Sequence, residues 1–556
     1  MKSSTVSSRH EVGDVSQTLS RVLRSRVAVH PERTFVSFPN TDTTYGQLFE
    51  RAAAFAKGLV AVGLKPGQHV AILMPNSPSY VELMFATYLA GGVLVPINAR
   101  FRRRELGFVL ADCDAEILIT TDAVDEYTDF TSLLADSLPG LRESSYGSRG
   151  SAAGAPRLRH IFLEGVKRVP FADPLQDLVE AGIGIDDETL AAATSYEGID
   201  SLAMLLYTSG TTSNPKGCEL THGALLRSWS AYADLVGFEA NESMWTPCPF
   251  FHVAGIGVTV AALVRGAAMM SMTHFEPSSA LEHIRRNHAE HLFPAFPALT
   301  LAIVRSPDYD AAKMAFVRTV LNVSPPEMQT MIRDLLPPET VLLTDYGMTE
   351  GAGMITATPL AAGDDERLLR NGRPLPGIEV RITEPGFEDE IVAPDVSGEI
   401  QFRGVNALRG YYNDPRSTAE TILRGGWVRT GDLGVVDANG SLLYLGRIKD
   451  ILKVGGENVT PLEVEAHLGT HPAVQMAQVV GRSSERYGEE PVAFVELLPH
   501  GHADAEELIE YCRGHLASYK IPREVRFVTS WPMSATKIQK FRLKELLAAE
   551  QKAAAD

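Results

Sequence analysis

Short apolar runs alternate with amphipathic helical stretches through the first half of the chain, and this alternation restricts the fold more than any other feature. Each run has strand length and is bounded by turn-forming residues. Five such runs are Val70–Met74, Val93–Ile97, Ile117–Thr120, His160–Leu163 and Leu202–Tyr207. Strands that alternate with helices favour an α/β fold with largely parallel sheets.

Charge and cysteine content exclude several classes of protein. Acidic residues outnumber basic ones, 69 against 51, and the formal charge of −18 disfavours nucleic acid and anionic membrane surfaces as partners. The 4 cysteines form no CxxC pair, which argues against a zinc or redox motif and fits a reducing compartment. Residues 1–14 are polar and lack the apolar core of a signal peptide. We therefore expect a cytoplasmic protein.

No apolar stretch has the length of a membrane-spanning helix. The longest candidate, residues 253–272, carries Arg265 and several glycines, and is predicted to be a buried helix followed by a strand. We expect no integral membrane segment.

The pattern changes twice further along the chain. Residues 139–157 are rich in Gly, Ser, Ala and Arg, which predicts a surface loop. From Arg373 onward short β segments dominate, and after Gly446 a polar, Lys-rich stretch precedes a smaller α/β unit. We place a domain boundary at about residue 448, which gives domains 1–448 and 449–556.

A loop of small and hydroxyl-bearing residues follows the strand 202–207 directly. Small side chains let backbone N–H groups approach a polyanion, while hydroxyls and an ammonium add donors and positive charge. From composition alone an ordinary polar loop is the alternative, and the spacing of a Walker A loop cannot be matched. The candidate phosphate ligands are Thr208, Ser209, Gly210, Thr211, Thr212 and Lys216.

The order of these residues, ending in Pro215-Lys216-Gly217, resembles the signature loop of the adenylate-forming superfamily. That superfamily contains acyl- and aryl-CoA synthetases, firefly luciferase and the adenylation domains of peptide synthetases. The chain departs from its pattern at Ser213, where glycine is usual. The resemblance covers nearly the whole chain. It implies a large N-terminal domain of doubly wound α/β subdomains with a distorted β-barrel, and a small mobile α+β C-terminal domain.

Residues 346–350, Tyr-Gly-Met-Thr-Glu, follow an apolar run and resemble the family's YGxTE motif. A loop at the end of a strand is where α/β sheets bind ligands. The resemblance implies that Tyr346 flanks the adenine and that the Thr349 hydroxyl reaches the α-phosphate. It also implies that Glu350 supplies a carboxylate oxygen to Mg²⁺, which takes few protein ligands besides phosphates. The nucleotide-binding residues predicted here are Asp345, Tyr346, Gly347 and Thr349.

Two further segments resemble family motifs in the expected order. Residues 249–255 resemble the PxFHxxG segment, which implies that His252 lies at the acyl site. Residues 427–432 resemble the [WY]xxTGD motif, which implies that Asp432 accepts hydrogen bonds from the ribose hydroxyls. Without the resemblance, His252 is as well explained as a core histidine and Asp432 as a turn residue.

The segment 446–459 is similar to the hinge of the family. By resemblance Arg447 contacts the nucleotide and Lys449 is the hinge residue. The resemblance also implies that Gly455 and Gly456 lie where the pantetheine arm of CoA passes, and backbone without side-chain bulk suits a narrow tunnel.

Residues 532–540 resemble the C-terminal motif of the family, with Thr536 in place of the usual glycine. By resemblance Lys537 bridges the substrate carboxylate and the α-phosphate. The implied reaction uses ATP and Mg²⁺ to convert a carboxylic acid to acyl-AMP, and then uses CoA to form acyl-CoA, releasing PPi and AMP. The predicted catalytic residues are Lys537, Thr349, Glu350 and His252.

The identity of the acid is predicted only as a class. Gly351, Ala352 and Gly353 leave space that favours a sizeable apolar acyl group, a fatty or branched alicyclic acid, over acetate. The alternatives are an aryl-acid CoA ligase, or a freestanding adenylation enzyme that loads a carrier protein. A non-catalytic nucleotide-binding regulator is the rival from another class, supported only by Ser213 and Thr536. The oligomeric state, including a homodimer, is left open.

Overall fold

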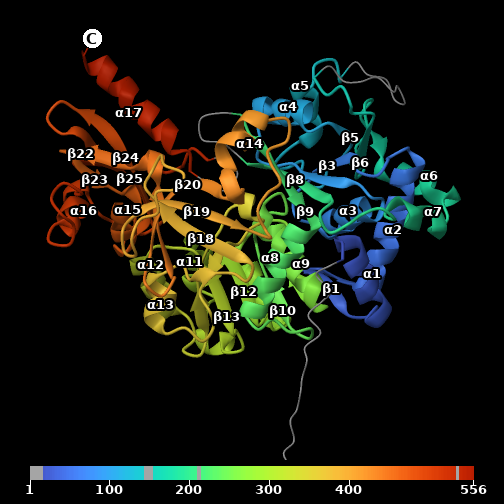
Figure 1. The fold of residues 1–556 in the computed structure, drawn as a ribbon, viewed down its shortest axis with the longest axis horizontal. Coiled ribbons are helices and arrows are strands. Elements are labelled where there is room, and N and C mark those ends of the chain that lie inside the picture. Colours follow the sequence, from blue (N-terminus) through green and yellow to red (C-terminus); the bar gives the residue numbers. More distant parts are fainter. Residues whose placement is uncertain (1–16, 143–153, 209–213, 534–537, 556) are drawn as a thin grey trace, which may run out of the picture.

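The computed structural model describes residues 17–142, 154–208, 214–533 and 538–555. Two large sheets occupy the N-terminal part, and a small sheet with its own helices lies at the opposite end of the molecule, coloured orange to red in Figure 1. Two small antiparallel sheets follow the two large ones along the chain. The fold class predicted from the alternation, α/β with a smaller C-terminal unit, is confirmed.

The first large sheet has seven strands in the order β7-β6-β5-β3-β4-β8-β9, parallel except for β9. Its strands are β3 (His69–Leu73), β4 (Val93–Pro96), β5 (Ala115–Thr121), β6 (His160–Glu164), β7 (Asp173–Pro174), β8 (Leu202–Thr208) and β9 (Lys216–Thr221). The accompanying helices are α2 (Tyr45–Ala61), α3 (Pro78–Leu89), α4 (Arg103–Asp112), α5 (Phe130–Ser137), α6 (Leu175–Ala181), η1 (Gly182–Gly184) and α7 (Asp187–Ala193).

Helices cover both faces of this sheet because its strands are apolar on both sides. In β3, Val70 and Ile72 belong to one hydrophobic cluster, whereas Ala71 and Leu73 belong to another. Near-continuous apolar runs of this kind are typical of buried parallel strands. All five strands predicted from the sequence are present, and their ends differ from the predicted ones by at most two residues.

The second large sheet is built in the same way, in the order β14-β13-β12-β10-β11-β1-β2. Its strands are β1 (Thr34–Phe38), β2 (Thr41–Thr44), β10 (Ser243–Trp245), β11 (Ala268–Met270), β12 (His291–Ala295), β13 (Thr319–Asn322) and β14 (Val341–Leu343). The helices around it are α1 (Leu19–Val29), α8 (His222–Leu235), α9 (Val253–Arg265), α10 (Pro277–Arg286), α11 (Pro297–Val304), η2 (Ala311–Met314), α12 (Pro326–Leu335) and α13 (Asp364–Leu369). The apolar stretch 253–272 is indeed a buried helix, α9, followed by a strand, β11.

Two antiparallel sheets follow, in the region expected as a distorted barrel. The smaller one joins β15 (Asp345–Tyr346), β16 (Thr356–Ala357) and β17 (Arg373–Pro374). The larger one joins β18 (Ile378–Thr383), β19 (Gly398–Gly404), β20 (Val428–Val436) and β21 (Leu442–Arg447). The short helices here are η3 (Thr349–Gly351), α14 (Pro415–Thr421) and η4 (Arg424–Gly426).

The C-terminal unit has its own sheet and hydrophobic clusters. The sheet runs β23-β22-β25-β24, with β26 parallel to β25. Its elements are η5 (Ile448–Asp450), β22 (Leu452–Val454), β23 (Glu457–Val459), α15 (Pro461–Gly469), β24 (Val474–Ser484), β25 (Gly488–Leu497), α16 (Ala505–Cys512), β26 (Glu524–Phe527) and α17 (Lys540–Ala555). Val464, Val479, Val495 and Leu508 are among the residues that fill one of its clusters.

No helix in the described ranges combines the length and the apolar character needed to cross a membrane. Of the predicted surface loop 139–157, residues 143–153 lie outside the described part of the chain.

Candidate active site

The predicted phosphate loop connects two paired strands at the edge of the first large sheet. Thr208 ends β8 and Lys216 begins β9, and the two residues are antiparallel partners. The loop therefore leaves the sheet at the carboxyl end of β8, the end at which α/β sheets bind ligands. The other four predicted ligands, Ser209, Gly210, Thr211 and Thr212, lie outside the described residues, as does Ser213.

Three residues from three separate motifs meet at one carboxylate. The Tyr346 hydroxyl donates a hydrogen bond of 2.7 Å to Asp432 Oδ2, and Arg447 Nε lies 2.8 Å from Asp432 Oδ1. Asp432 and Arg447 are antiparallel partners in β20 and β21, so the sheet register fixes their pairing. Tyr346 comes from β15, the neighbouring small sheet. Burial, followed by the nearby Asp432 charge, raises the pKa of Tyr346 well above its ordinary value.

The ring of Tyr346 also has an aromatic neighbour. Tyr444 of β21 stacks on it, with ring centroids 5.6 Å apart and an interplanar angle of 27°. One flat surface and one carboxylate are thus presented together, which suits a purine and the hydroxyls of a sugar.

A second group of contacts forms around Glu350. The Tyr411 hydroxyl donates to Glu350 Oε1 at 2.8 Å, and Lys216 Nζ lies 5.0 Å from the centroid of the Tyr411 ring. This aromatic ring therefore links the end of the phosphate loop to the predicted magnesium ligand through a cation–π contact and a hydrogen bond. Thr349, next to Glu350, is buried.

His252 occupies the N-cap of α9. Its Nδ1 accepts a hydrogen bond of 3.3 Å from the Ala254 N–H, which satisfies one of the free donors at the start of the helix. An accepting Nδ1 leaves Nε2 as the protonated nitrogen of a neutral ring. The preceding residue, Phe251, lines a large cavity described below.

Asp345 and Gly347 flank Tyr346 and differ in their surroundings. Asp345 is only 7% exposed, and burial raises the pKa of its carboxyl to about 7. A Cβ at Gly347 would lie 1.8 Å from the Gly353 carbonyl oxygen. Only glycine allows these two parts of the loop to come so close.

The predicted hinge residue lies just after β21, and the two predicted pantetheine residues lie in the hairpin that follows. Lys449 is in η5, directly after β21, and burial lowers the pKa of its ammonium. Gly455 and Gly456 form the turn between β22 and β23, with φ values of +60° and +91°. Two consecutive residues with positive φ favour glycine in a two-residue hairpin, so turn geometry alone accounts for both glycines.

Lys537 lies outside the described residues. Met533 and Ile538, which stand on either side of the undescribed segment, pair with each other as an isolated β-bridge. Both residues line the same large cavity as Phe251. The described chain therefore delivers both ends of the segment that carries Lys537 to this cavity.

The cavity, of about 760 Å³, lies between the N-terminal and C-terminal domains. Its N-terminal side includes Arg100, Cys248 and Phe296, and its C-terminal side includes Ala466 and Met476. The walls are mainly apolar and aromatic with a few polar groups, the usual makeup of a site for small molecules.

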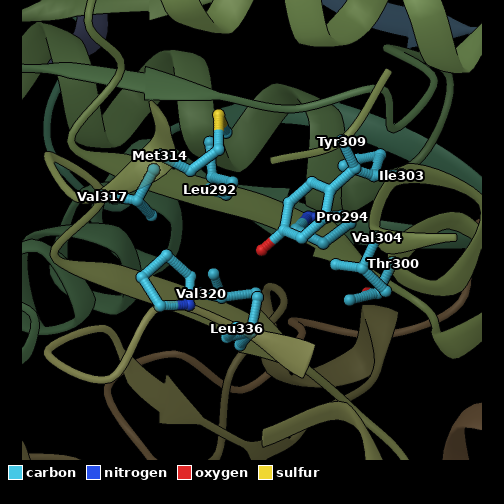
Figure 2. Close-up of a pocket in the computed structure, with 11 residues that line it drawn as sticks. Leu292, Pro294, Thr300, Ile303, Val304, Tyr309, Met314, Val317, Val320 and Leu336 are labelled. Atoms are coloured by element: carbon cyan, nitrogen blue, oxygen red, sulfur yellow. The ribbon is translucent and has the colours of Figure 1, made fainter. Parts of the chain in front are cut away.

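A second, much smaller space lies within the second large sheet's hydrophobic cluster. It holds only about 20 Å³, roughly the room of one water molecule. Figure 2 shows the apolar side chains around it, with the hydroxyl of Tyr309 pointing inward. That hydroxyl donates to the Leu335 carbonyl at 3.0 Å. We interpret this space as a packing gap, since it is too small for a substrate.

Three residues of the site have no signal in the sequence motifs. Tyr411 and Tyr444 enter only through their contacts with Glu350 and Tyr346. Trp229 enters through its packing beneath the 346–353 loop, where its indole donates to the Ala352 carbonyl. Each is an aromatic residue that becomes recognisable only when distant segments are brought together.

The small residues of that loop were predicted to leave room for substrate, and this is wrong at two positions. A Cβ at Gly353 would lie 2.8 Å from the Trp229 ring, and a Cβ at Gly351 would lie 2.7 Å from Ile355. The space beside both glycines is already filled by neighbouring side chains.

Comparisons with known proteins agree with this architecture. The profile for AMP-binding enzymes matches residues 23–412, and that for the AMP-binding enzyme C-terminal domain matches residues 463–537. The putative acyl-CoA synthetase YngI of Bacillus subtilis (strain 168) is 34% identical over 96% of this chain and 97% of its own. Feruloyl-CoA synthase of an Amycolatopsis species is 32% identical over 92% and 95%. The structure of ATP-bound MatB from Rhodopseudomonas palustris matches with a TM-score of 0.79 at 26% identity, over 95% of this chain and 99% of that one.

Fold and sequence together define a two-domain enzyme of the adenylate-forming type. The chain belongs to the AMP-binding enzyme family, and its class within that family is AMP-forming acid–CoA ligase. ATP and CoA are the co-substrates of this class. The predictions of family, fold class and enzymatic class are confirmed.

Proposed function

We propose that this enzyme activates an apolar carboxylic acid, fatty or branched alicyclic, as its acyl-AMP and transfers the acyl group to CoA. The proposal that ATP binds here rests on one observation: Tyr346 and Arg447 both contact the buried carboxylate of Asp432. Three motifs that are far apart in sequence converge there, and a chance set of turns would not do so.

In this proposal the nucleoside of ATP binds at that carboxylate. Asp432 accepts hydrogen bonds from the ribose hydroxyls, while Tyr346 and Arg447 hold its carboxylate in place. The adenine lies beside the Tyr346 ring, with Asp345 and Gly347 in the same loop. The triphosphate extends toward Thr208, the 209–212 segment and Lys216, where donors and positive charge are concentrated.

Glu350 has the donor chemistry that Mg²⁺ requires, a carboxylate oxygen. The described chain contains no group of three or more His, Cys, Asp or Glu side chains able to hold a metal. An ion at Glu350 would therefore take its remaining ligands from phosphate and water, the usual arrangement for Mg²⁺. It would neutralise charge on the phosphates, and the hydrogen bond from Tyr411 would orient the carboxylate.

The first half-reaction joins the acid to the nucleotide. A carboxylate oxygen attacks the α-phosphorus, the bond to the bridging oxygen breaks, and pyrophosphate leaves. The barrier comes largely from bringing anions together, so fixed donors and cations lower it without a protein nucleophile. We assign this role to Lys537 and Thr349, and we place His252 beside the acyl group.

The second half-reaction exchanges the nucleotide for a thiol. The CoA sulfur, having lost its proton, attacks the acyl carbon, and AMP leaves with the electrons of the acyl–oxygen bond. We propose that the domains divide at about residue 448 and that the small one turns about Lys449 between the steps. Gly455 and Gly456 then lie along the path of the pantetheine arm. Motions of this kind occur in microseconds to milliseconds.

A cytoplasmic location fits the chemistry of the cysteines. All four are free and buried, and burial raises the pKa of the Cys113 and Cys248 thiols to about 12. Such thiols are inert and need no oxidising compartment.

The test is ATP–pyrophosphate exchange across a panel of acids, followed by thioester formation with CoA. Exchange with aliphatic or alicyclic acids and CoA thioester formation are expected. The runner-up, an aryl-acid ligase, is favoured by the similarity to feruloyl-CoA synthase and would show exchange with aryl acids only. A carrier-loading enzyme would transfer the acyl group to a carrier's pantetheine but not to free CoA. No exchange with any acid would refute the proposal.

A further inference from the structure

The two small antiparallel sheets are joined at one asparagine that lies in none of the motifs described above. Asn371 follows α13 and precedes β17, and it is only 7% exposed. Its backbone N–H donates to the Leu442 carbonyl at 2.6 Å, and its backbone carbonyl accepts from the Thr356 hydroxyl at 2.6 Å. The backbone of this residue therefore links β21 of one sheet to β16 of the other.

The side chain of Asn371 adds two further hydrogen bonds. Its Nδ2 donates to the Asp345 carbonyl at 3.1 Å, and its Oδ1 accepts from the Tyr444 N–H at 2.9 Å. Both partners are backbone groups, of which the carbonyl can only accept and the N–H can only donate. A side-chain amide supplies one donor and one acceptor at the same end. These two partners thus account for an asparagine at this position.

The two partners belong to the backbones that carry the tyrosines of the nucleotide site. The Asp345 carbonyl directly precedes the N–H of Tyr346, and the N–H of Tyr444 is bonded directly. The rings of Tyr346 and Tyr444 stack with centroids 5.6 Å apart. The Asn371 amide therefore connects β15 to β21 at the two residues whose rings form this pair.

The position of β15 relative to β21 decides how Asp432 is held. Arg447 reaches its carboxylate from β21, which pairs directly with the strand that carries Asp432. Tyr346 reaches the same carboxylate from β15, which belongs to the other small sheet. Strand register therefore fixes only one of the two contacts, and the other depends on how the sheets are held together. Asn371 is a direct link between them.

We propose that Asn371 is a positioning residue for ATP, which holds β15 against β21 and so aligns the Asp432 carboxylate with the ribose hydroxyls. It acts through Tyr346 and Asp432, not by contact with the nucleotide. This inference rests on the proposed function, which places the ribose at Asp432. A residue that served stability alone would leave recognition of the ribose unchanged in the molecules that fold.

The test is the ratio of kcat/KM for ATP to kcat/KM for 3′-deoxy-ATP in ATP–pyrophosphate exchange. This ratio does not depend on the folded fraction of a variant, because both nucleotides are measured on the same preparation. Asn371→Ala should lower the wild-type preference for ATP by about tenfold, since well-aligned hydrogen bonds to a charged group supply about ten- to a hundredfold. KM for ATP should rise, while KM for the acid should stay near the wild-type value. An unchanged ratio in Asn371→Ala would overturn the inference.

A second variant separates the hydrogen bonds from the filling of space. Asn371→Leu occupies nearly the same volume and removes both side-chain hydrogen bonds. It should lower the ratio as Asn371→Ala does, and it replaces that variant if Asn371→Ala fails to fold. A wild-type ratio in Asn371→Leu would show that the amide only fills space and would overturn the inference.

Asn76→Leu is the matched control. Asn76 is 5% exposed and also joins two backbone groups, since it donates to the Cys248 carbonyl at 2.9 Å and accepts from the Phe250 N–H at 2.8 Å. Its loss should destabilise the fold without changing the ratio. An equal fall of the ratio in Asn76→Leu would mean that any lost buried amide has this effect, and the inference would then be wrong.

The two proposals fail in different ways. If the wild-type enzyme shows no exchange with any acid, the proposed function is wrong. If it is active but uses 3′-deoxy-ATP as well as ATP, the ribose does not bind at Asp432 and the inference is lost with that placement. If it discriminates and both Asn371 variants keep the wild-type ratio, only the role of Asn371 is wrong.

Discussion

The phenol of Tyr346 donates a hydrogen bond of 2.7 Å to Asp432, a residue 86 positions further along the chain. Arg447 approaches the other oxygen of the same carboxylate. This buried carboxylate is held from both sides, so its oxygens have fixed directions before any ligand arrives. A group that must bind two neighbouring hydroxyls benefits from such preorganisation.

Replacing Asp432 should therefore weaken ATP binding more than it slows the chemistry. We expect Asp432→Ala to raise KM for ATP by about ten- to a hundredfold, because hydrogen bonds to a charged group are worth about 1.5–3 kcal/mol. The measurement is ATP–pyrophosphate exchange with ATP and with 2′-deoxy- and 3′-deoxy-ATP. The wild-type enzyme should discriminate against the deoxy analogues and the variant should not. Retained discrimination in Asp432→Ala would place the ribose elsewhere.

Glu350 should govern the dependence on Mg²⁺. We expect Glu350→Gln to need about tenfold more Mg²⁺ for half-maximal exchange, a loss of about 1.4 kcal/mol. Tyr411→Phe removes only the hydrogen bond that orients the carboxylate, so its shift should be smaller. Titration of exchange activity with Mg²⁺ at fixed ATP gives both values. An unaltered Mg²⁺ requirement in Glu350→Gln would remove this residue from the metal site.

Asp345 should make the folded state less stable as pH rises. Its folded-state pKa of about 7 lies above the ordinary value of 3.8, because burial disfavours the charged form. Below about pH 4 the Asp345 carboxyl is protonated in both the folded and the unfolded protein, so it does not affect stability. The cost of ionising it in the folded state lowers the free energy of unfolding progressively between about pH 4 and 7, and this loss is complete above about pH 7.

Asp345→Asn removes that penalty. Relative to wild type, its free energy of unfolding should be unchanged near pH 4 and higher by up to about 4 kcal/mol near pH 8. Urea unfolding at the two pH values tests this. If the free energy of unfolding of Asp345→Asn differed from that of wild type by the same amount at pH 4 and pH 8, the Asp345 carboxyl would not titrate between these pH values.

The sequence predicted the elements and the motif positions well because both depend on local patterns. The strand before the phosphate loop is apparent from the apolar run that ends at Tyr207, and β8 ends one residue later. The Tyr-Gly-Met-Thr-Glu motif likewise follows β14 closely. Such signals are contained in a few neighbouring residues.

Contacts between distant segments could not be predicted in this way. Asp432 and Arg447 were each assigned to the nucleotide, but their pairing follows from the register of β20 and β21. Gly353 was predicted to leave open space, because a sequence shows that this residue has no side chain but does not show which neighbour fills that volume. Here that neighbour is Trp229, more than a hundred residues earlier in the chain.

The lysine at 537 gives the sharpest separation of the two half-reactions. We expect Lys537→Ala to lower acyl-AMP formation by at least about a hundredfold, the usual cost of losing one positioned transition-state contact. Thioester formation from supplied acyl-AMP should stay close to wild type, since the proposed second step does not use this ammonium. Lys540→Ala is the matched control, because that lysine pairs with Glu465 in the C-terminal domain and should retain acyl-AMP formation. Equal losses in both half-reactions for Lys537→Ala would assign the residue to folding or domain closure and not to the attack on phosphorus.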